Sequence, residues 1–212
     1  MLKLQIIIGS TREGRNSEAV SHWFVPIARA HGAFEEVEIL DLRDWPLPFF
    51  EETIATVGDF ANPTYSDPLV KRWNDKIREA DAYLIVTPEY NHSIPAVLKN
   101  AIDTVFFSYS FRQKPVAFVG YSLGFTAAAR AVEHLTQIMV ETEAVPVRTS
   151  TLVPLVREAF DEKGQPASPG QTVTLNAMLD DLAWLGKALK TARSEGQLMP
   201  AALRIRAASG RK

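Results

Sequence analysis

Short apolar runs alternate with longer amphipathic segments along this sequence, and this alternation constrains its fold more than any other feature. The first apolar run, residues 4–8, is rich in isoleucine and ends at Gly9 and Ser10, as is typical of a strand buried on both faces of a parallel sheet. Apolar residues at helical spacing follow it over residues 20–27. Repeated strand–helix pairs predict an α/β fold in which helices cover both faces of a parallel sheet.

We expect five strands and about five helices. The strands are expected near residues 4–8, 37–42, 82–87, 115–119 and 145–152, and the helices near residues 17–27, 69–80, 95–106, 131–138 and 175–190. Residues 45–68 are rich in proline and predict a long loop, and residues 161–171 predict another. Pro26 lies inside the first helical pattern, so that helix is expected to bend or end near it.

The composition excludes several classes of function. At 212 residues the chain fits one large domain, which we place at residues 1–192, followed by a basic tail at residues 193–212. A net charge of −2 gives no reason to expect nucleic acid or membrane as a partner. The chain has no cysteine, so redox chemistry would need a bound cofactor. No secretory-signal pattern and no apolar run of ~18 residues is seen, and we expect a cytoplasmic protein.

Ligands of such sheets bind at the carboxyl ends of the strands, which directs attention to residues 9–17, 87–95 and 120–127. The first of these loops combines small residues, two arginines and the start of a helix, an inventory that suits a phosphate monoester. Gly9 and Gly14 also have the spacing of a nucleotide P-loop, but Arg15 and Asn16 stand where that motif needs Lys and Ser or Thr. The other interpretation is a capped loop whose arginines face water.

The second loop, residues 87–95, places polar and aromatic residues between an apolar strand and an apolar helix. Its backbone amides, with Tyr90 as a wall and Asn91 as donor and acceptor, could hold a flat heteroaromatic ring by its polar edge. The alternative is a rigid proline-bounded turn capped at Ser93. His92 alone is weak evidence for catalysis, and His22 and His31 have no partner at metal-ligand spacing, so no metal site is expected.

The third loop contains Gly-Tyr-Ser-Leu-Gly at residues 120–124, which matches the nucleophile elbow of serine hydrolases. Such an enzyme needs a histidine after the serine, and His134 is the only one after Ser122. Because His134 falls in the next helix, it would lie ~18 Å along the helix axis from Ser122, whereas a triad requires contact at ~3 Å. We therefore interpret this segment as a loop that lets a ligand or a neighbouring backbone approach closely.

Three sets of residues carry a family resemblance. The first loop reads Gly9-Ser10-x-Arg12-x-x-Arg15-Asn16-Ser17, the second reads Pro88-Glu89-Tyr90-Asn91-His92-Ser93-x-Pro95 and continues into Leu98-Lys99-Asn100-Ala101-Ile102-Asp103, and Arg130-Ala131 follows the third. With them the sequence resembles the NAD(P)H-dependent FMN reductase family of flavodoxin-like proteins over about residues 3–190. The second set is the specific part of the resemblance.

The resemblance implies a flavodoxin-like three-layer sandwich with a five-stranded sheet of order 2-1-3-4-5, non-covalent FMN, and a homodimer or homotetramer. It implies that Ser10, Arg12, Arg15, Asn16 and Ser17 hold the FMN phosphate, that Pro88, Glu89, Tyr90, Asn91 and His92 wrap the isoalloxazine edge, and that Ser122 and Gly124 lie beside the ring. Relatives often carry a Gly-Gly pair before the Arg-Ala, where this chain has residues 126–129, Thr-Ala-Ala-Ala. This departure affects how closely the backbone of the third loop can approach a ligand or a neighbouring segment.

The resemblance also implies a ping-pong oxidoreductase in which hydride passes from NADPH or NADH through FMN to a small-molecule acceptor. The cofactor would carry the chemistry, so no side chain is assigned as an acid or base. Two other functions stay open. One is a flavodoxin-like electron carrier, although such carriers usually have a strongly acidic surface and the net charge of this chain is only −2. The other is a flavin-free ligand-binding or regulatory protein. The acceptor and the choice between NADPH and NADH are left open by the sequence.

Replacement of Arg15 by alanine is expected to weaken FMN retention, because it removes a charge-assisted hydrogen bond to the phosphate. The measurement is the flavin absorbance that remains after desalting. A variant that still purifies with a full complement of FMN would contradict the phosphate role of Arg15.

Overall fold

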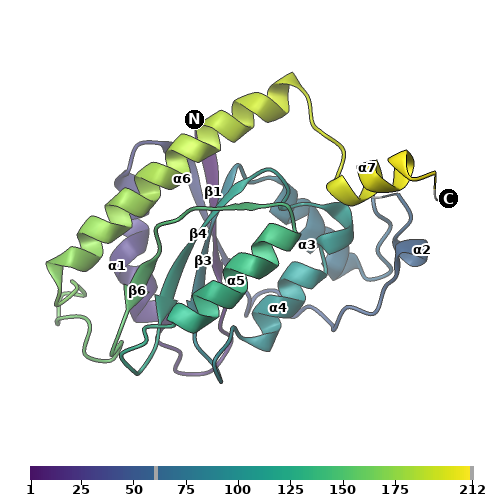
Figure 1. Cartoon of the computed structure of the whole chain (residues 1–212). Helices are drawn as coiled ribbons and strands as arrows, with labels where there is room; N and C mark the ends of the chain where they lie inside the picture. The colour runs from purple at the N-terminus through teal and green to yellow at the C-terminus, as the bar shows by residue number, and fades with distance from the viewer. Residues whose placement is uncertain (60–61, 211–212) are drawn as a thin grey trace.

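The computed structural model describes residues 1–59 and 62–210 and shows a parallel sheet between two layers of helices (Figure 1). The strands follow the order β2-β1-β3-β4-β5, and β6 also pairs with β4. The strands are β1 (Leu2–Ile8), β2 (Phe34–Asp41), β3 (Ala82–Pro88), β4 (Pro115–Tyr121), β5 (Val145–Pro146) and β6 (Thr151–Val153). The predicted α/β sandwich with the order 2-1-3-4-5 is therefore confirmed.

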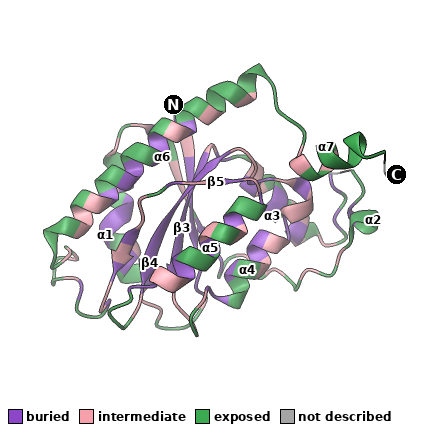
Figure 2. Cartoon of the chain, viewed as in Figure 1, coloured by how far each residue is buried: buried purple, intermediate pink, exposed green. Residues whose placement is uncertain are grey.

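Helices cover both faces of the sheet. They are α1 (Ser17–Ala30), α2 (Ile54–Val57), α3 (Pro68–Arg78), α4 (Ala96–Asp103), α5 (Ala129–Glu141), α6 (Pro169–Glu195) and α7 (Ala201–Ala208), with a 3-10 turn η1 (Phe106–Ser108). The apolar faces of α1 and α6 share one core with alternate residues of β1, and α3, α4 and α5 share the other core with Ile7 of β1. Every residue of β3 is buried, as the purple central strands in Figure 2 show.

The edge of the sheet beside β4 differs from the prediction. One strand was expected near residues 145–152, but the chain pairs with β4 twice, first at Val145–Pro146 and again at Thr151–Val153. Polar residues 148–150 separate the two segments, and the chain leaves the ladder across them. Both short strands are parallel to β4, so the topology is unchanged.

Several predicted boundaries also move. The first helix was expected to bend or end near Pro26, and it does not end there, because α1 continues to Ala30 with its buried face against the sheet. α4 ends at Asp103, and Phe106 begins the 3-10 turn instead of extending the helix. α6 begins at Pro169 and ends at Glu195, so it is longer than expected and takes residues 169–171 from the predicted loop. The loop at residues 45–68 contains the short helix α2.

The C-terminal segment is largely helical. Arg193 lies inside α6, and Arg204 and Arg206 lie on α7, while Arg211 and Lys212 fall outside the described residues. The division of the chain at residue 192 stays a prediction. Within the described ranges no helix is long and apolar enough to cross a membrane, and no group of three or more potential ligand side chains could hold a metal ion.

Asp81 ties together the amino ends of β1, β3 and the last turns of α6. Its carboxylate accepts hydrogen bonds from the Lys3 backbone N–H at 3.1 Å, Lys190 Nζ at 2.7 Å and Arg193 Nη2 at 3.1 Å. Burial alone would raise the pKa of Asp81, but these three donors lower it below its ordinary value. The carboxylate therefore stabilises the fold in its charged form.

Replacement of Asp81 by asparagine is expected to lower the free energy of unfolding at pH 7 by about 1 kcal/mol, because solvent screens part of the ion pairing. The pKa of Asp81 is lower in the folded state, so its contribution is present above the unfolded pKa of ~4 and lost as the pH falls through the folded pKa. Urea unfolding at several pH values measures this. Exposed Glu35→Gln is the control, and a deficit that persists unchanged at pH 2 would contradict the assignment.

Candidate functional site

The three predicted loops meet at the carboxyl edge of the sheet and line one cleft with a volume of about 580 Å³. This lies within the usual range of ligand pockets, roughly 300–1,000 Å³. Most of the predicted site residues line it: Arg12, Arg15, Asn16, Pro88, Glu89, Tyr90, Asn91, His92, Ser122 and Gly124. Ser10 and Ser17 are buried beside it and do not form its wall.

The first and second loops are joined through Tyr90. Its hydroxyl lies 2.7 Å from Ser10 Oγ, and the guanidinium carbon of Arg12 lies 3.6 Å from the centroid of its ring. A cation stacked on an aromatic face is attracted to it electrostatically. Tyr90 thus holds Arg12 at the cleft, where the positive charge faces any anionic ligand.

Arg15 is engaged more tightly than the sequence suggested. Its Nη1 donates to Asp41 Oδ1 at 2.7 Å and to the Ser10 carbonyl at 2.5 Å, and Nη2 donates to Asp41 Oδ2. Its side chain is only 5% exposed. The hydrogen bond to Asp41 raises the pKa of Arg15. Burial would raise the pKa of Asp41, but Arg15 lowers it below its ordinary value. The main visible role of Arg15 is to fix the first loop onto the end of β2.

The amino end of α1 has the features that a phosphate group needs. Asn16 precedes the helix without forming a side-chain cap, so the first N–H groups of α1 lack that acceptor. The Ser17 and Tyr121 hydroxyls are buried, and among the described residues they have no hydrogen-bond partner. A phosphate at this helix end would accept from such donors and complement the helix dipole. The residues present therefore fit the phosphate of FMN.

The second loop is a tight two-residue turn. Tyr90 and Ser93 exchange backbone hydrogen bonds of 2.8 and 3.1 Å, and Asn91 and His92 between them have φ values of 50° and 73°. Both central residues of this type of turn require positive φ, which asparagine tolerates better than most residues. The turn leaves the Asn91 and His92 side chains exposed at the cleft.

Glu89 links the second loop to α5, the helix that follows the third loop. Arg130 donates to its Oε1 from Nε at 2.7 Å and also from Nη2. This ion pair, together with the N–H groups of Arg130 and Ala131, lowers the pKa of Glu89. Glu89 thus supplies an acceptor at the amino end of α5, where the helix has no side-chain cap of its own. The carboxylate is anchored, which fits a positioning role.

In the third loop, Ser122 and His134 are bonded to other groups and not to each other. Ser122 Oγ donates to the Gly124 carbonyl at 2.9 Å, while His134 Nδ1 lies 3.0 Å from Ser93 Oγ. A Cβ at Gly120 would come within 3.0 Å of the Ala127 carbonyl and 2.9 Å of Leu152. Glycine is therefore needed at position 120 for close approach of neighbouring chain, as the sequence indicated.

The alanines of the third loop adopt a backbone that favours glycine. Ala127 and Ala128 are buried and have φ values of 51° and 67°. This is the stretch in which relatives often carry a Gly-Gly pair. The chain therefore keeps a left-handed conformation here, at a cost of roughly 1 kcal/mol or more per residue.

Some cleft residues were missed by the sequence. Tyr121, Val156 and Arg157 line the cleft. Arg130 forms an ion pair with Glu89, whereas the sequence indicated Arg130 only as part of the Arg-Ala motif. Tyr121 ends a strand and could have been found from that position. Arg157 follows β6, whose boundary was misplaced, so the sequence offered no signal for it. Its exposed side chain adds a cation near Asn16.

A parallel sheet of this order, with a ligand-sized cleft at its carboxyl edge, defines the flavodoxin-like class of α/β proteins. The sequence matches the NADPH-dependent FMN reductase family over residues 2–156. The chain belongs to this family, and it is an oxidoreductase whose cofactor is FMN and whose electron donor is NAD(P)H.

Individual relatives agree with this. The chain is 32% identical over 167 residues to NAD(P)H-dependent FMN reductase PA1204 of Pseudomonas aeruginosa, covering 77% of this chain and 84% of that protein. It is 33% identical over 147 residues to a quinone reductase of Escherichia coli K12, covering 68% and 73%. The solved structure of FerB, a flavoenzyme NAD(P)H:(acceptor) oxidoreductase from Paracoccus denitrificans, superposes with a TM-score of 0.70 at 23% identity over 89% of this chain and 98% of that one.

Replacement of Ala127 by glycine is expected to raise the melting temperature by a few degrees, because glycine adopts positive φ without strain. The matched control is Ala131→Gly, within α5, where the same change should destabilise by about 1 kcal/mol. Thermal unfolding of both variants tests this. A melting temperature that falls equally in both would show that the left-handed backbone at Ala127 is not strained.

Proposed function

We propose that this protein passes reducing equivalents from NAD(P)H through FMN to a small organic acceptor, with a quinone as the first candidate, by a ping-pong mechanism. The observation that carries the proposal is that all three loops converge on one cleft at the carboxyl edge of the sheet. Donor and acceptor would then have to use the same cleft one after the other. A quinone is favoured because relatives named quinone reductase are about one-third identical to this chain.

FMN supplies the redox chemistry when it is bound, and the chain supplies binding and orientation. The amino end of α1, with the hydroxyl of Ser17, would hold the phosphate. The turn at residues 90–93 would present backbone amides and the Asn91 side chain to the polar edge of the ring. Arg12 and Arg157 on the cleft wall would favour the negative charges of FMN and NAD(P)H.

The third loop, which supplies part of the cleft wall, also offers apolar surface for an acceptor or for a second subunit. Leu123 and Phe125 in the third loop are 58% and 85% exposed, which is unusual for large apolar side chains. We propose that a homodimer or homotetramer covers part of this surface and that the protein is cytoplasmic. Gel filtration at several protein concentrations tests the oligomeric state.

The test of the function is the visible spectrum of the protein after incubation with FMN and desalting, followed by anaerobic addition of NADPH. Retained absorbance that bleaches within seconds supports a nicotinamide-dependent flavoenzyme. Retained absorbance that persists would favour the electron carrier. A colourless protein that cannot be reconstituted would favour the flavin-free binding protein.

Steady-state kinetics then test the mechanism and the acceptor. Double-reciprocal plots against NADPH at several quinone concentrations should give parallel lines, whereas intersecting lines would contradict the ping-pong mechanism. The acceptor screen compares quinones with azo compounds, nitroaromatics, metal oxyanions and free flavin. A quinone that is turned over no better than these would overturn its assignment as the first candidate.

A further inference from the structure

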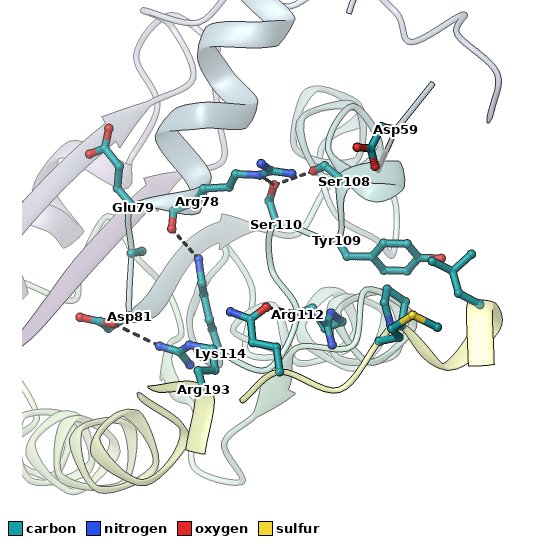
Figure 3. A pocket seen from close by; sticks show the side chains of 15 residues that line it. Asp59, Arg78, Glu79, Asp81, Ser108, Tyr109, Ser110, Arg112, Lys114 and Arg193 are labelled. Carbon is teal, nitrogen blue, oxygen red and sulfur yellow. Dashed lines mark hydrogen bonds and ion pairs between the residues drawn. The ribbon is translucent and has the colours of Figure 1, made fainter. Parts of the chain in front are cut away.

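Lys114 shows how a buried cation in this fold holds backbone carbonyls. It lies in the wall of a second cavity of about 650 Å³ at the amino edge of the sheet, which Leu203 of the C-terminal segment also lines (Figure 3). Its Nζ donates to the Ile77 carbonyl at 3.3 Å, the Arg78 carbonyl at 2.9 Å and the Tyr83 hydroxyl at 3.0 Å. These three bonds use all the donors of an ammonium group, so Lys114 holds the chain together.

Arg43 is placed to do the same for the first loop. It follows the end of β2 by two residues, and β2 pairs in parallel with β1 so that Asp41 lies opposite Ile8. The turn after β2 therefore lies beside the loop after β1. The backbone N–H of Arg43 donates to Asp41 Oδ1 at 2.9 Å, which fixes the start of this turn.

Two arginines bind three successive carbonyls of the first loop. Arg43 donates from Nη2 to the Arg12 carbonyl and from Nε to the Thr11 carbonyl at 3.4 Å. Arg15 donates from Nη1 to the Ser10 carbonyl at 2.5 Å. The carbonyls of residues 10–12 are thus all engaged by guanidinium groups.

The charges of these two arginines are balanced by carboxylates. Arg43 Nη1 donates to Glu18 Oε1 at 2.8 Å, and Arg15 forms its ion pair with Asp41. Two cations and two anions leave the group without net charge. Its effect on a ligand in the cleft must therefore come mainly from the orientation that it gives to the loop.

The N–H groups of the same loop are free of such contacts. No backbone N–H of residues 10–16 donates a hydrogen bond to another residue that the structure describes. In a trans peptide the C=O of one residue and the N–H of the next point in opposite directions. Because the carbonyls of residues 10–12 face the two arginines, the N–H groups of residues 11–13 point away from them.

The cleft formed by the three loops, which we call the flavin cleft, lies on the side of these N–H groups. Residues 12–16 line it, whereas Arg43 and Asp41 are not part of its wall. Arg43 lines a separate apolar pocket with Thr11 and Trp45 instead. It therefore acts on the first loop from behind and does not touch a ligand in the flavin cleft.

We propose that Arg43 is a positioning residue for the FMN phosphate. By binding the carbonyls of residues 11 and 12, it keeps the N–H groups of residues 12 and 13 directed at the phosphate, next to the amino end of α1. Without Arg43 these peptide units can rotate and present carbonyl oxygens, which repel an anion. The inference rests on the phosphate position given in the proposed function.

The test compares FMN with riboflavin, which has the same ring and ribityl chain without the phosphate. Protein loaded with either flavin is diluted, and the rise in flavin fluorescence gives the dissociation constant. Arg43→Gln is expected to weaken FMN binding about 10-fold and riboflavin binding less than about two-fold, because only FMN needs the oriented N–H groups. A merely structural role would weaken the binding of both flavins.

Two further variants separate orientation from charge. Arg43→Lys keeps the charge, but one ammonium group cannot replace the guanidinium bonds to two carbonyls and Glu18, so FMN binding should stay at least about 3-fold weaker than in the wild type. Arg29→Gln removes the same charge from the exposed last turn of α1 and should change neither affinity. The melting temperature of each variant reports whether it folds.

Unchanged FMN affinity in Arg43→Gln, or equal losses for FMN and riboflavin, would overturn the role of Arg43. If Arg43→Gln does not fold, the same comparison in Arg43→Lys decides the question, and full FMN affinity in Arg43→Lys would overturn the role of the carbonyl contacts. A wild-type protein that binds riboflavin as tightly as FMN would overturn the phosphate position together with this role. NADPH-dependent bleaching of the wild type tests the proposed function separately, so the two failures are distinguishable.

Discussion

The structure depends on the burial of β3 on both faces. All seven of its residues are buried, and the side chains of residues 82–86 alternate between the core shared with α1 and α6 and the core shared with α3, α4 and α5. A strand of this kind leaves no face for water, so helices must cover both sides of the sheet. The crossover connections then bring the loops after β1, β3 and β4 to one edge, and the flavin cleft forms where they meet.

The two edges of the sheet differ in the interactions that they contain. At the carboxyl edge, loops with glycine, serine and asparagine leave helix N–H groups and hydroxyls available to a ligand, and the fixed pairs Arg15–Asp41 and Arg130–Glu89 keep those loops in place. At the amino edge, Asp81 joins β1, β3 and α6, and the C-terminal segment lines a cavity whose wall includes the buried Lys114. Both edges thus rely on ion pairs to hold the chain.

The sequence predicted the site better than it predicted the interactions within it. The loops were found because polar and glycine-rich segments follow apolar strands, and most of the proposed residues do line the cleft. The partner of Arg15 could not be found in this way, because Asp41 ends a different strand and becomes its neighbour only when β2 pairs with β1. Arg157 was missed because the strand before it is short and separated from β5 by polar residues. Pro26 misled the prediction of α1 because the packing of the helix on the sheet outweighs the lost hydrogen bond.

What the sequence determined by itself is local in origin. The periodicity of apolar residues selected strands and helices, and the composition of the loops marked the edge at which a ligand binds, because both depend on residues close together in the chain. Tertiary structure alone decided the ion pairs Arg15–Asp41 and Asp81–Lys190, since it brings these side chains together from distant segments. It also decided that Ala127 and Ala128 adopt positive φ and that the C-terminal segment encloses a second cavity, because packing against the rest of the fold can override a residue's own preference.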